Sequence, residues 1–309
     1  MKSASSTTAT HEAHDHDLGL RHDLRVLARQ SQERRRMLGL LTGVGGSLWL
    51  PGCGGGGGDS GTSVAASSSS TTTTGTTTST VNTTTSASAT TCIADPTETA
   101  GPYPADGSNR ANGSVVNVLV ASGIVRSNIR SSFGTSTTTA AGVPLELTVS
   151  LVNTNAACAA LSGYAIYLWH CNAAGQYSLY DLPAENYLRG VQVSDDLGQA
   201  TFLSIFPGCY SGRYPHIHFE VYRSGSTATQ GSNALLTSQM ALPREACTAV
   251  YAADSTTYSG STANLSRVTT ANDNVFGDNT AAQIAAQTPT LAGGRTTGYT
   301  GTIVIGLAL

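Results

Sequence analysis

Residues 145–151 read Leu145-Glu146-Leu147-Thr148-Val149-Ser150-Leu151, so apolar and polar side chains alternate without a break. Successive side chains of a β-strand point to opposite faces of its sheet, and this alternation therefore predicts a half-buried strand. Further strands are expected at 115–120, 163–170, 190–194, 200–206, 216–222, 234–240 and 299–307. Only one short helix is expected, near residues 279–287. Many short strands with this spacing predict an all-β fold, a sandwich or a barrel.

The composition divides the chain of 309 residues into three parts. Residues 1–53 are first basic and then apolar, and residues 54–91 are almost wholly Gly, Ser, Thr and Ala. The second part cannot bury enough apolar surface to offset the entropy lost on ordering, so we expect a disordered linker there. Only residues 92–309 have the mixed composition of a packed domain, and their number fits one all-β domain.

The first part has the features of an export signal. Arginines 34–36 precede an apolar run that is too short and too rich in glycine to span a bilayer stably. The arginine pair before Met37 and Leu38 resembles a twin-arginine signal. Residues 50–53 (Leu-Pro-Gly-Cys) resemble a lipobox, although an ordinary cleaved signal is the alternative. We therefore expect the domain on the periplasmic side of the cell envelope, attached to the membrane only by a lipid at Cys53.

The charge of the exported part argues against nucleic-acid binding. After Cys53 the sequence holds nine Arg, no Lys and fourteen Asp or Glu, which gives a net charge of −5. Such a surface lacks the basic patch that nucleic-acid partners require. The same part holds five cysteines: Cys92, Cys158, Cys171, Cys209 and Cys247. In an oxidising compartment some of them should pair and at least one must stay free, but the sequence does not determine the connectivity.

Three histidines follow the predicted signal: His170, His216 and His218. His216 and His218 are residues i and i+2 of one predicted strand, so both imidazoles point to the same face and can reach a common point. A pair of this kind is also compatible with surface or core histidines. His170 is expected to pack or to form hydrogen bonds beside Trp169, and Arg189 to form hydrogen bonds at a strand end.

Two tyrosines and an arginine lie close to this pair in the predicted topology. Tyr210 belongs to a Pro-Gly and Ser-Gly loop that leads directly into the histidine strand, and Tyr177 follows a predicted turn at 172–175. Ionised phenols are hard donors, which favour Fe³⁺ over Zn²⁺ or Cu⁺. Arg213 adds a fixed positive charge that suits an anionic substrate or intermediate.

These segments resemble the intradiol ring-cleavage dioxygenases, the family of catechol 1,2- and protocatechuate 3,4-dioxygenases. The resemblance covers roughly Cys92 to the C-terminus, and its most specific block is 202–218, which ends Gly-Arg-Tyr-Pro-His-Ile-His. The other matching stretches are 99–103, 125–130, 142–145, 167–178 and 188–198. The resemblance implies a β-sandwich-like catalytic domain with a few short helices.

The resemblance also implies the roles of individual residues. The four ligands of a non-haem Fe³⁺ fall on Tyr177, Tyr210, His216 and His218. Arg213 matches the arginine that stabilises the substrate during ring attack, and Tyr210 matches the ligand that the substrate displaces. The implied reaction is cleavage of a catechol-type ring by O₂ to a muconate-type diacid, without a further cofactor.

Two departures from the family pattern concern the substrate and leave all four ligands in place. The helical N-terminal region typical of catechol 1,2-dioxygenases is replaced by signal and linker, and Cys209 stands beside Tyr210. One alternative is a non-catalytic envelope β-sandwich module that binds catechols or ferric chelates. Another is copper or zinc on His216 and His218. The sequence leaves open the ring substituents of the substrate, the physiological pathway and whether the chain forms a homo-oligomer.

Overall fold

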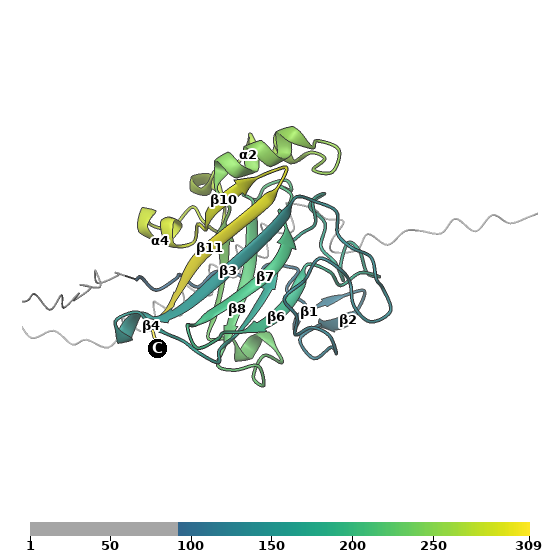
Figure 1. Cartoon of the computed structure of the whole chain (residues 1–309). Coiled ribbons are helices and arrows are strands. Elements are labelled where there is room, and N and C mark those ends of the chain that lie inside the picture. Colours follow the sequence, from purple (N-terminus) through teal and green to yellow (C-terminus); the bar gives the residue numbers. More distant parts are fainter. Residues whose placement is uncertain (1–91) are drawn as a thin grey trace, which may run out of the picture.

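The structure is a computed structural model that describes residues 92–309. The predicted signal and lipobox (1–53) and the predicted linker (54–91) lie outside the described residues. The described part contains two main β-sheets, a two-stranded hairpin beside them and a few short helices (Figure 1). This arrangement confirms the predicted all-β sandwich.

The first main sheet contains the strand with which the sequence analysis began. Its strands are, in order, β10 (Thr290–Gly294), β11 (Gly298–Leu307), β3 (Pro144–Asn153) and β4 (Ala159–Ala160), with β7 (Gln199–Ile205) also paired to β3. Only β11 and β3 run parallel. Along β3, Leu145, Leu147 and Val149 are buried whereas Glu146 is exposed, which confirms the alternation.

The second main sheet is antiparallel throughout. Its strands are, in order, β6 (Arg189–Val193), β5 (Ala165–Trp169), β8 (His216–Tyr222) and β9 (Leu236–Ala241). Every residue of β5 and β8 is buried, because both faces of this sheet are covered. Ile166 and Phe219 pack with the first sheet in the main core, whereas Tyr167 and Trp169 pack on the other face with residues of 105–124.

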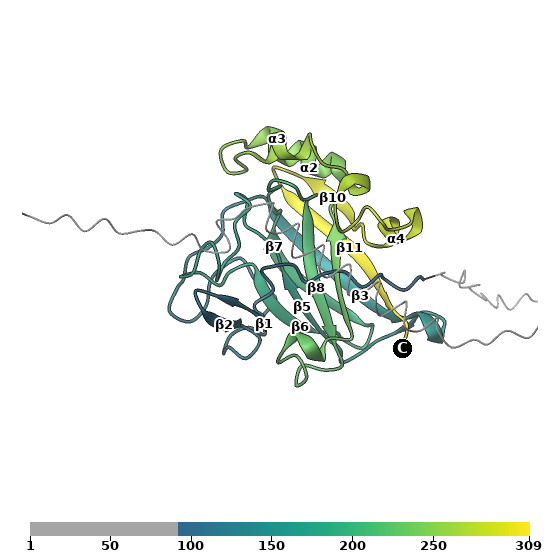
Figure 2. The same ribbon diagram turned by 180° about the vertical axis from the view of Figure 1, so that it is seen from behind.

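The smaller elements lie at opposite sides of the sandwich in both ribbon views (Figures 1 and 2). On one side are α2 (Arg244–Ala253), α3 (Ser261–Leu265) and α4 (Ala281–Ala286), and on the other are β1 (Asp106–Ala111) and β2 (Ser114–Asn117). Within residues 92–309, no helix is both long and apolar enough to cross a membrane.

Comparison of these elements with the expectations shows where the sequence pattern was insufficient. The expected helix at 279–287 is α4, which begins at a capping box of Thr280 and Gln283. The sequence analysis missed α2 and α3, and also β1, β4 and β10. Strand β1 has no apolar periodicity, and β4 has only two residues. Helix α2 does bury residues at helical spacing (Cys247, Val250 and Tyr251), which was the signal available for it.

One disulfide joins Cys92 to Cys158 and so ties the start of the described chain to the region before β4. The three remaining cysteines of this part, Cys171, Cys209 and Cys247, are free and buried. The expectation that some cysteines pair while at least one stays free is therefore confirmed for residues 92–309.

Candidate metal centre

The two histidines of β8 bring their ring nitrogens together. His216 and His218 lie on the same face of the strand, and their Nε2 atoms are 3.0 Å apart. Both residues are almost fully buried, with 2 % and 3 % of their surface exposed. The i, i+2 spacing thus places both imidazoles at one point, as the sequence pattern predicted.

Both predicted tyrosines reach the same point. The Oη atom of Tyr177 lies 3.3 Å from the Nε2 atoms of His216 and His218, and the Oη atom of Tyr210 lies 3.2 Å from Nε2 of His216. Tyr177 is buried, whereas Tyr210 is partly exposed. The structure therefore brings together all four side chains that the sequence singled out, from two loops and one strand.

Neighbouring groups fix the orientation of the two imidazoles. Nδ1 of His216 lies 2.6 Å from the carbonyl oxygen of Tyr214, so this nitrogen carries the hydrogen and Nε2 presents a lone pair to the phenols. The His218 ring stacks on Trp169, with centroids 4.9 Å apart and an interplanar angle of 7°. Its Nδ1 atom is buried and has no hydrogen-bond partner among residues 92–309. Nε2 is therefore the ring nitrogen of His218 that faces Tyr177 and His216.

Burial controls the protonation of the four groups. It lowers the pKa of His216 to about 3, with the positive charge of Arg213 acting in the same direction, and it lowers the pKa of His218 well below its usual value. Both imidazoles are thus neutral, which is the form that binds metals. Burial also raises the pKa of Tyr177 and of Tyr210, although Arg213 opposes this at Tyr210. A cation at the centre would supply the charge that the phenols need to ionise.

The donor set fits a hard metal ion. Two phenol oxygens and two neutral imidazole nitrogens converge within hydrogen-bond distances, and facing lone pairs at such distances repel unless a hydrogen or a cation lies between them. Within residues 92–309 no group of three or more His, Cys, Asp or Glu side chains could hold a metal ion. The centre depends on tyrosine, and mixed phenolate and imidazole donors suit Fe³⁺.

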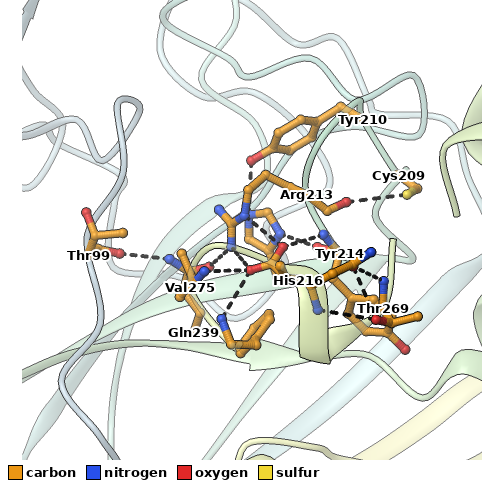
Figure 3. A network of polar contacts seen from close by, with 12 residues as sticks. Thr99, Cys209, Tyr210, Arg213, Tyr214, His216, Gln239, Thr269 and Val275 are labelled. Atoms are coloured by element: carbon orange, nitrogen blue, oxygen red, sulfur yellow. Dashed lines mark hydrogen bonds and ion pairs between the residues drawn. The ribbon is translucent and has the colours of Figure 1, made fainter. Parts of the chain in front are cut away.

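Arg213 lies beside Tyr210 and His216 and is held by a polar network (Figure 3). Its Nε donates to Oδ2 of Asp273 at 3.0 Å, the only ion pair within residues 92–309. Its Nη2 donates to Oε1 of Gln239 at 2.6 Å, and Gln239 in turn donates to the carbonyl of Thr99 at 2.8 Å. A planar guanidinium bound on two sides has little freedom to turn.

Asp273 organises the loop as well as the arginine. Its carboxylate also accepts from the backbone N–H of Tyr214 at 2.7 Å and from that of Val275 at 2.9 Å. Burial acts to raise the pKa of Asp273, but Arg213 and the N–H of Tyr214 hold that pKa below its usual value. The sequence analysis missed Asp273, because an isolated aspartate in an irregular segment 60 residues from Arg213 is indistinguishable from a turn residue.

Two glycines set the spacing between the loops that carry the tyrosines. Gly175 has a φ of +84°, and a Cβ atom there would lie 2.9 Å from Cβ of Tyr210. A Cβ atom at Gly208 would lie 2.3 Å from the carbonyl oxygen of Ala173. Because only glycine permits these approaches, the turn before Tyr177 packs directly against the loop of Tyr210.

Other residues considered at the outset have structural contacts. His170 lies with Nε2 2.6 Å from Oγ of Ser204 and donates from Nδ1 to the carbonyl of Cys171, which agrees with its expected hydrogen-bonding role. The thiol of Cys209 is free and lies 3.6 Å from the carbonyl of Arg213. Burial raises the pKa of this thiol to about 12, so it stays protonated beside the centre.

Comparisons with known proteins agree on the fold. No protein-family model matches the chain, and a sequence search of curated proteins finds no match. Among solved structures, an intradiol ring-cleavage dioxygenase from Tetranychus urticae is 21 % identical, with a TM-score of 0.52 over 70 % of this chain and 94 % of that one. A second structure, described as a dioxygenase, gives the same values. Residues 92–309 therefore share the fold of an intradiol ring-cleavage dioxygenase, which confirms at the level of the fold the resemblance found in the sequence.

Proposed function

We propose that residues 92–309 form a non-haem iron(III) dioxygenase that cleaves catechol-type rings between the two hydroxylated carbons. Both oxygen atoms of O₂ would enter the product, a muconate-type diacid. The observation that carries this proposal is the convergence of two phenol oxygens and two imidazole nitrogens at one buried point. The shared fold with an intradiol dioxygenase supports the same reaction class.

In this proposal Tyr177, Tyr210, His216 and His218 hold the iron. When bound, Fe³⁺ would supply the Lewis acidity and the electron exchange that make a chelated catecholate reactive toward O₂. The substrate and O₂ are then the only small molecules required besides the metal. The protein contributes neutral imidazoles, fixed by Tyr214 and Trp169, and phenols whose ionisation a nearby cation would favour.

Tyr210 suits the role of the group that gives way to the substrate. It is the more exposed of the two phenols, and it lies on a loop rather than on a strand. Its Oη contacts one histidine, whereas Oη of Tyr177 contacts both. If Oη of Tyr210 gave way to the substrate as a phenolate, it would take up one of the two protons that a catechol must lose to bind as the dianion.

Arg213 suits the stabilisation of negative charge on the ring. The pKa of Arg213 is raised because Tyr210 and Asp273 outweigh the opposing effect of burial, so the guanidinium keeps its charge at any relevant pH. Asp273 and Gln239 fix its plane before the substrate arrives. A charge that needs no reorganisation during the reaction stabilises a transition state most effectively.

We also propose that residues 1–53 export the domain by the twin-arginine route and leave it lipid-anchored at Cys53, with residues 54–91 as the linker. The arginine pair, the short apolar run and the Leu-Pro-Gly-Cys sequence support this proposal. The half-buried disulfide Cys92–Cys158 is compatible with an oxidising compartment. Replacing Arg35 and Arg36 by Lys should leave precursor in the cytoplasm, and Cys53→Ser should release the domain from the membrane fraction. Unchanged fractionation of both variants would refute the proposal.

The decisive experiment on the reaction uses the full chain expressed with ample iron. We expect about one iron per chain, a broad visible band from phenolate-to-iron charge transfer, and O₂ consumption with a panel of catechols. Product masses should equal substrate plus O₂, and the product should be a muconate-type diacid. A folded protein that stays colourless and free of iron would refute the assignment, as would ring opening outside the two hydroxyls. Copper or zinc in place of iron would favour the alternative based on His216 and His218.

A further inference from the structure

Arg189 lies in the same cross-sheet row as one of the proposed iron ligands. It begins β6 and stands opposite Trp169 of β5, which stands opposite His218 of β8. Directly opposed residues of antiparallel strands point to the same face, so Arg189, Trp169 and His218 share the face that carries the centre. The indole of Trp169 stacks on the imidazole of His218 and also on the ring of Tyr167, two residues earlier in β5, whose centroid is 4.8 Å away.

The guanidinium of Arg189 is buried without a carboxylate partner. Only 1 % of the residue is exposed, and within residues 92–309 no Asp or Glu lies within ion-pair distance of it. Its hydrogen-bond acceptors within residues 92–309 are neutral: Oγ of Ser178 at 3.0 Å, the carbonyl of Ser178 at 2.9 Å, and both the carbonyl of Pro104 and Oη of Tyr167 at 3.1 Å. Burying a charge without a counter-ion is costly, so this arginine is poorly explained by stability alone.

Two of these four bonds hold the residue next to Tyr177. Arg189 binds both the side chain and the carbonyl of Ser178, and Ser178 also donates from Oγ to the carbonyl of Tyr187. The backbone N–H of Tyr177 is bound separately, to the carboxylate of Asp181 at 2.7 Å. The segment that presents the buried phenol is therefore anchored on its C-terminal side to a strand of the sheet that carries the histidines.

The same guanidinium also contacts the stack that supports His218. Its Nη1 donates to Oη of Tyr167, and the hydroxyl of Tyr167 in turn donates to the carbonyl of Pro104 at 2.8 Å. Tyr167, Trp169 and His218 then follow as three stacked rings. One rigid, planar group thus connects the loop of one proposed ligand to the ring plane of another.

We propose that Arg189 is a positioning residue that fixes Tyr177 relative to His218, and so holds the iron centre in its proper geometry. This inference rests on the proposed function for its iron, but the link between the two segments is a property of the metal-free chain. The planar fork is required, because an ammonium group cannot bind Oγ and the carbonyl of Ser178 together with Oη of Tyr167 in the same arrangement.

The test compares Arg189→Met and Arg189→Lys with Arg126→Met as a matched control. Arg126 is half-buried and donates to the carbonyls of Ser131, Asn186 and Arg189 itself, but it does not bind Ser178. In iron-loaded protein, Arg189→Met should shift the visible band and speed iron loss to a chelator by about 10–100-fold, as loss of a group supporting a metal ligand typically does. Arg189→Lys should recover only part of this change, and Arg126→Met should keep the parental band and rate.

A measurement on metal-free protein separates this inference from the proposed function. Hydrogen exchange should become faster in the segment 177–182 of Arg189→Met, whose amides are held by Asp181 and by the carbonyl of Tyr177. Exchange in strand β3 should stay parental in every variant. If the parent binds no iron, the proposed function fails while exchange still decides whether Arg189 fixes the segment. If a folded Arg189→Met keeps the parental exchange, or keeps the parental band and iron-release rate in a parent that does bind iron, the inference is wrong.

Discussion

Strand β8 points Ile217, Phe219 and Val221 to one face of its sheet and His216, His218 and Glu220 to the other, and both sets are buried. The first set packs against the other main sheet in the apolar core. The second set faces loop segments: a Cβ atom at Gly101 would lie 3.4 Å from the His218 ring, and His216 contacts Tyr177 and Tyr210. The strand thus lies between two interiors: one is apolar, and the other, called the polar face below, combines polar groups with aromatic rings.

The difference between these faces distinguishes buried side chains that stabilise the fold from buried side chains that form the proposed site. Removing an apolar side chain from water stabilises the sandwich, whereas burying an imidazole or a guanidinium costs free energy unless it is paired. On the polar face the acceptors and donors are arranged around one point, and Nδ1 of His218 has no partner in the described part of the chain. Burial of this kind is explained by chemistry at the site rather than by stability.

The largest expected effect comes from removing a donor on the polar face. His218→Ala should abolish stoichiometric iron binding, the visible band and ring cleavage, because three donors without His218 hold the metal poorly. The fold should persist, since the variant removes the ring contact with Trp169 but leaves the main apolar core unchanged. Elemental analysis and the visible spectrum measure the loss, and His170→Asn is the control, as His170 is buried but bonded to Ser204 instead. Full iron occupancy in His218→Ala would contradict the assignment of the iron site to the face of β8 that carries His218.

The neighbouring residue tests the apolar face. Phe219 is fully buried in the main core, and Phe219→Ala should lower the free energy of unfolding by about 3–5 kcal/mol. At a temperature where the variant is still folded, iron content and the visible band should remain parental. Urea unfolding followed by circular dichroism gives the stability, and Phe219→Leu should lose less. A folded Phe219→Ala without iron would show that the two faces are not independent.

Replacing Arg213 should give the next largest effect, and this effect should be limited to turnover. Loss of one electrostatic stabiliser typically lowers turnover by about 10²–10³-fold, and Arg213→Leu should do so while keeping iron and colour. Because this variant leaves Asp273 buried without its partner, the double variant Arg213→Leu with Asp273→Leu is the control for folding. Oxygen consumption at saturating catechol measures turnover. Parental turnover in either folded, iron-loaded variant would remove Arg213 from the mechanism.

Sequence patterns predicted those strands in which the side chains on the two faces differ in polarity. The alternation in Leu145 to Leu151 gave β3, and His216 and His218 fell on one face because side-chain direction in a strand has a period of two. The four proposed donors could also be predicted from the sequence. Two tyrosines and two histidines are an unusual combination, and the loops of the tyrosines were expected to lie close to the histidine strand. Strands without an apolar pattern, such as β1 with Asp-Gly-Ser-Asn-Arg-Ala, carried no such signal.

The supporting residues could not be predicted, because they depend on register and on contacts across long stretches of chain. Gln239 faces His218 only through the pairing of β9 with β8, and Asp273 reaches Arg213 from a segment 60 residues away. Arg189 was expected to form hydrogen bonds at a strand end, and it is the first residue of β6. Its hydrogen bonds to Ser178 and Tyr167, however, follow from tertiary packing. A single sequence specifies the donors more clearly than the groups that hold them.

The smallest effect concerns a buried polar group outside both faces of β8. Asp95 is bonded to Gly306 of β11: its N–H donates to the carbonyl of Gly306, and its Oδ2 accepts from the N–H of Gly306 at 2.8 Å. Its Oδ1 is buried and has no partner among residues 92–309. Asp95 lies outside the proposed iron site. Its burial should therefore lower the stability of the fold without contributing to turnover.

Burial raises the pKa of Asp95 from its ordinary value to about 7, although the N–H of Gly306 opposes this effect. The folded state therefore holds a proton that the unfolded state releases, so the stability that Asp95 contributes is complete below pH 4 and is lost as the pH rises toward 7.

Asp95→Asn should remove this part of the pH dependence and raise the free energy of unfolding at pH 8 by about 1–2 kcal/mol. The gain is smaller than the whole pKa shift implies, because the buried amide N–H₂ of the new side chain is left unpaired. Urea unfolding at pH 5 and pH 8 measures the slope, with Glu146→Gln as the control for losing an exposed carboxylate on the same sheet. Turnover at pH 7 should not change. An unchanged slope would mean that Asp95 is charged in the folded state, and a loss of turnover would extend the polar region beyond the face that carries His216 and His218.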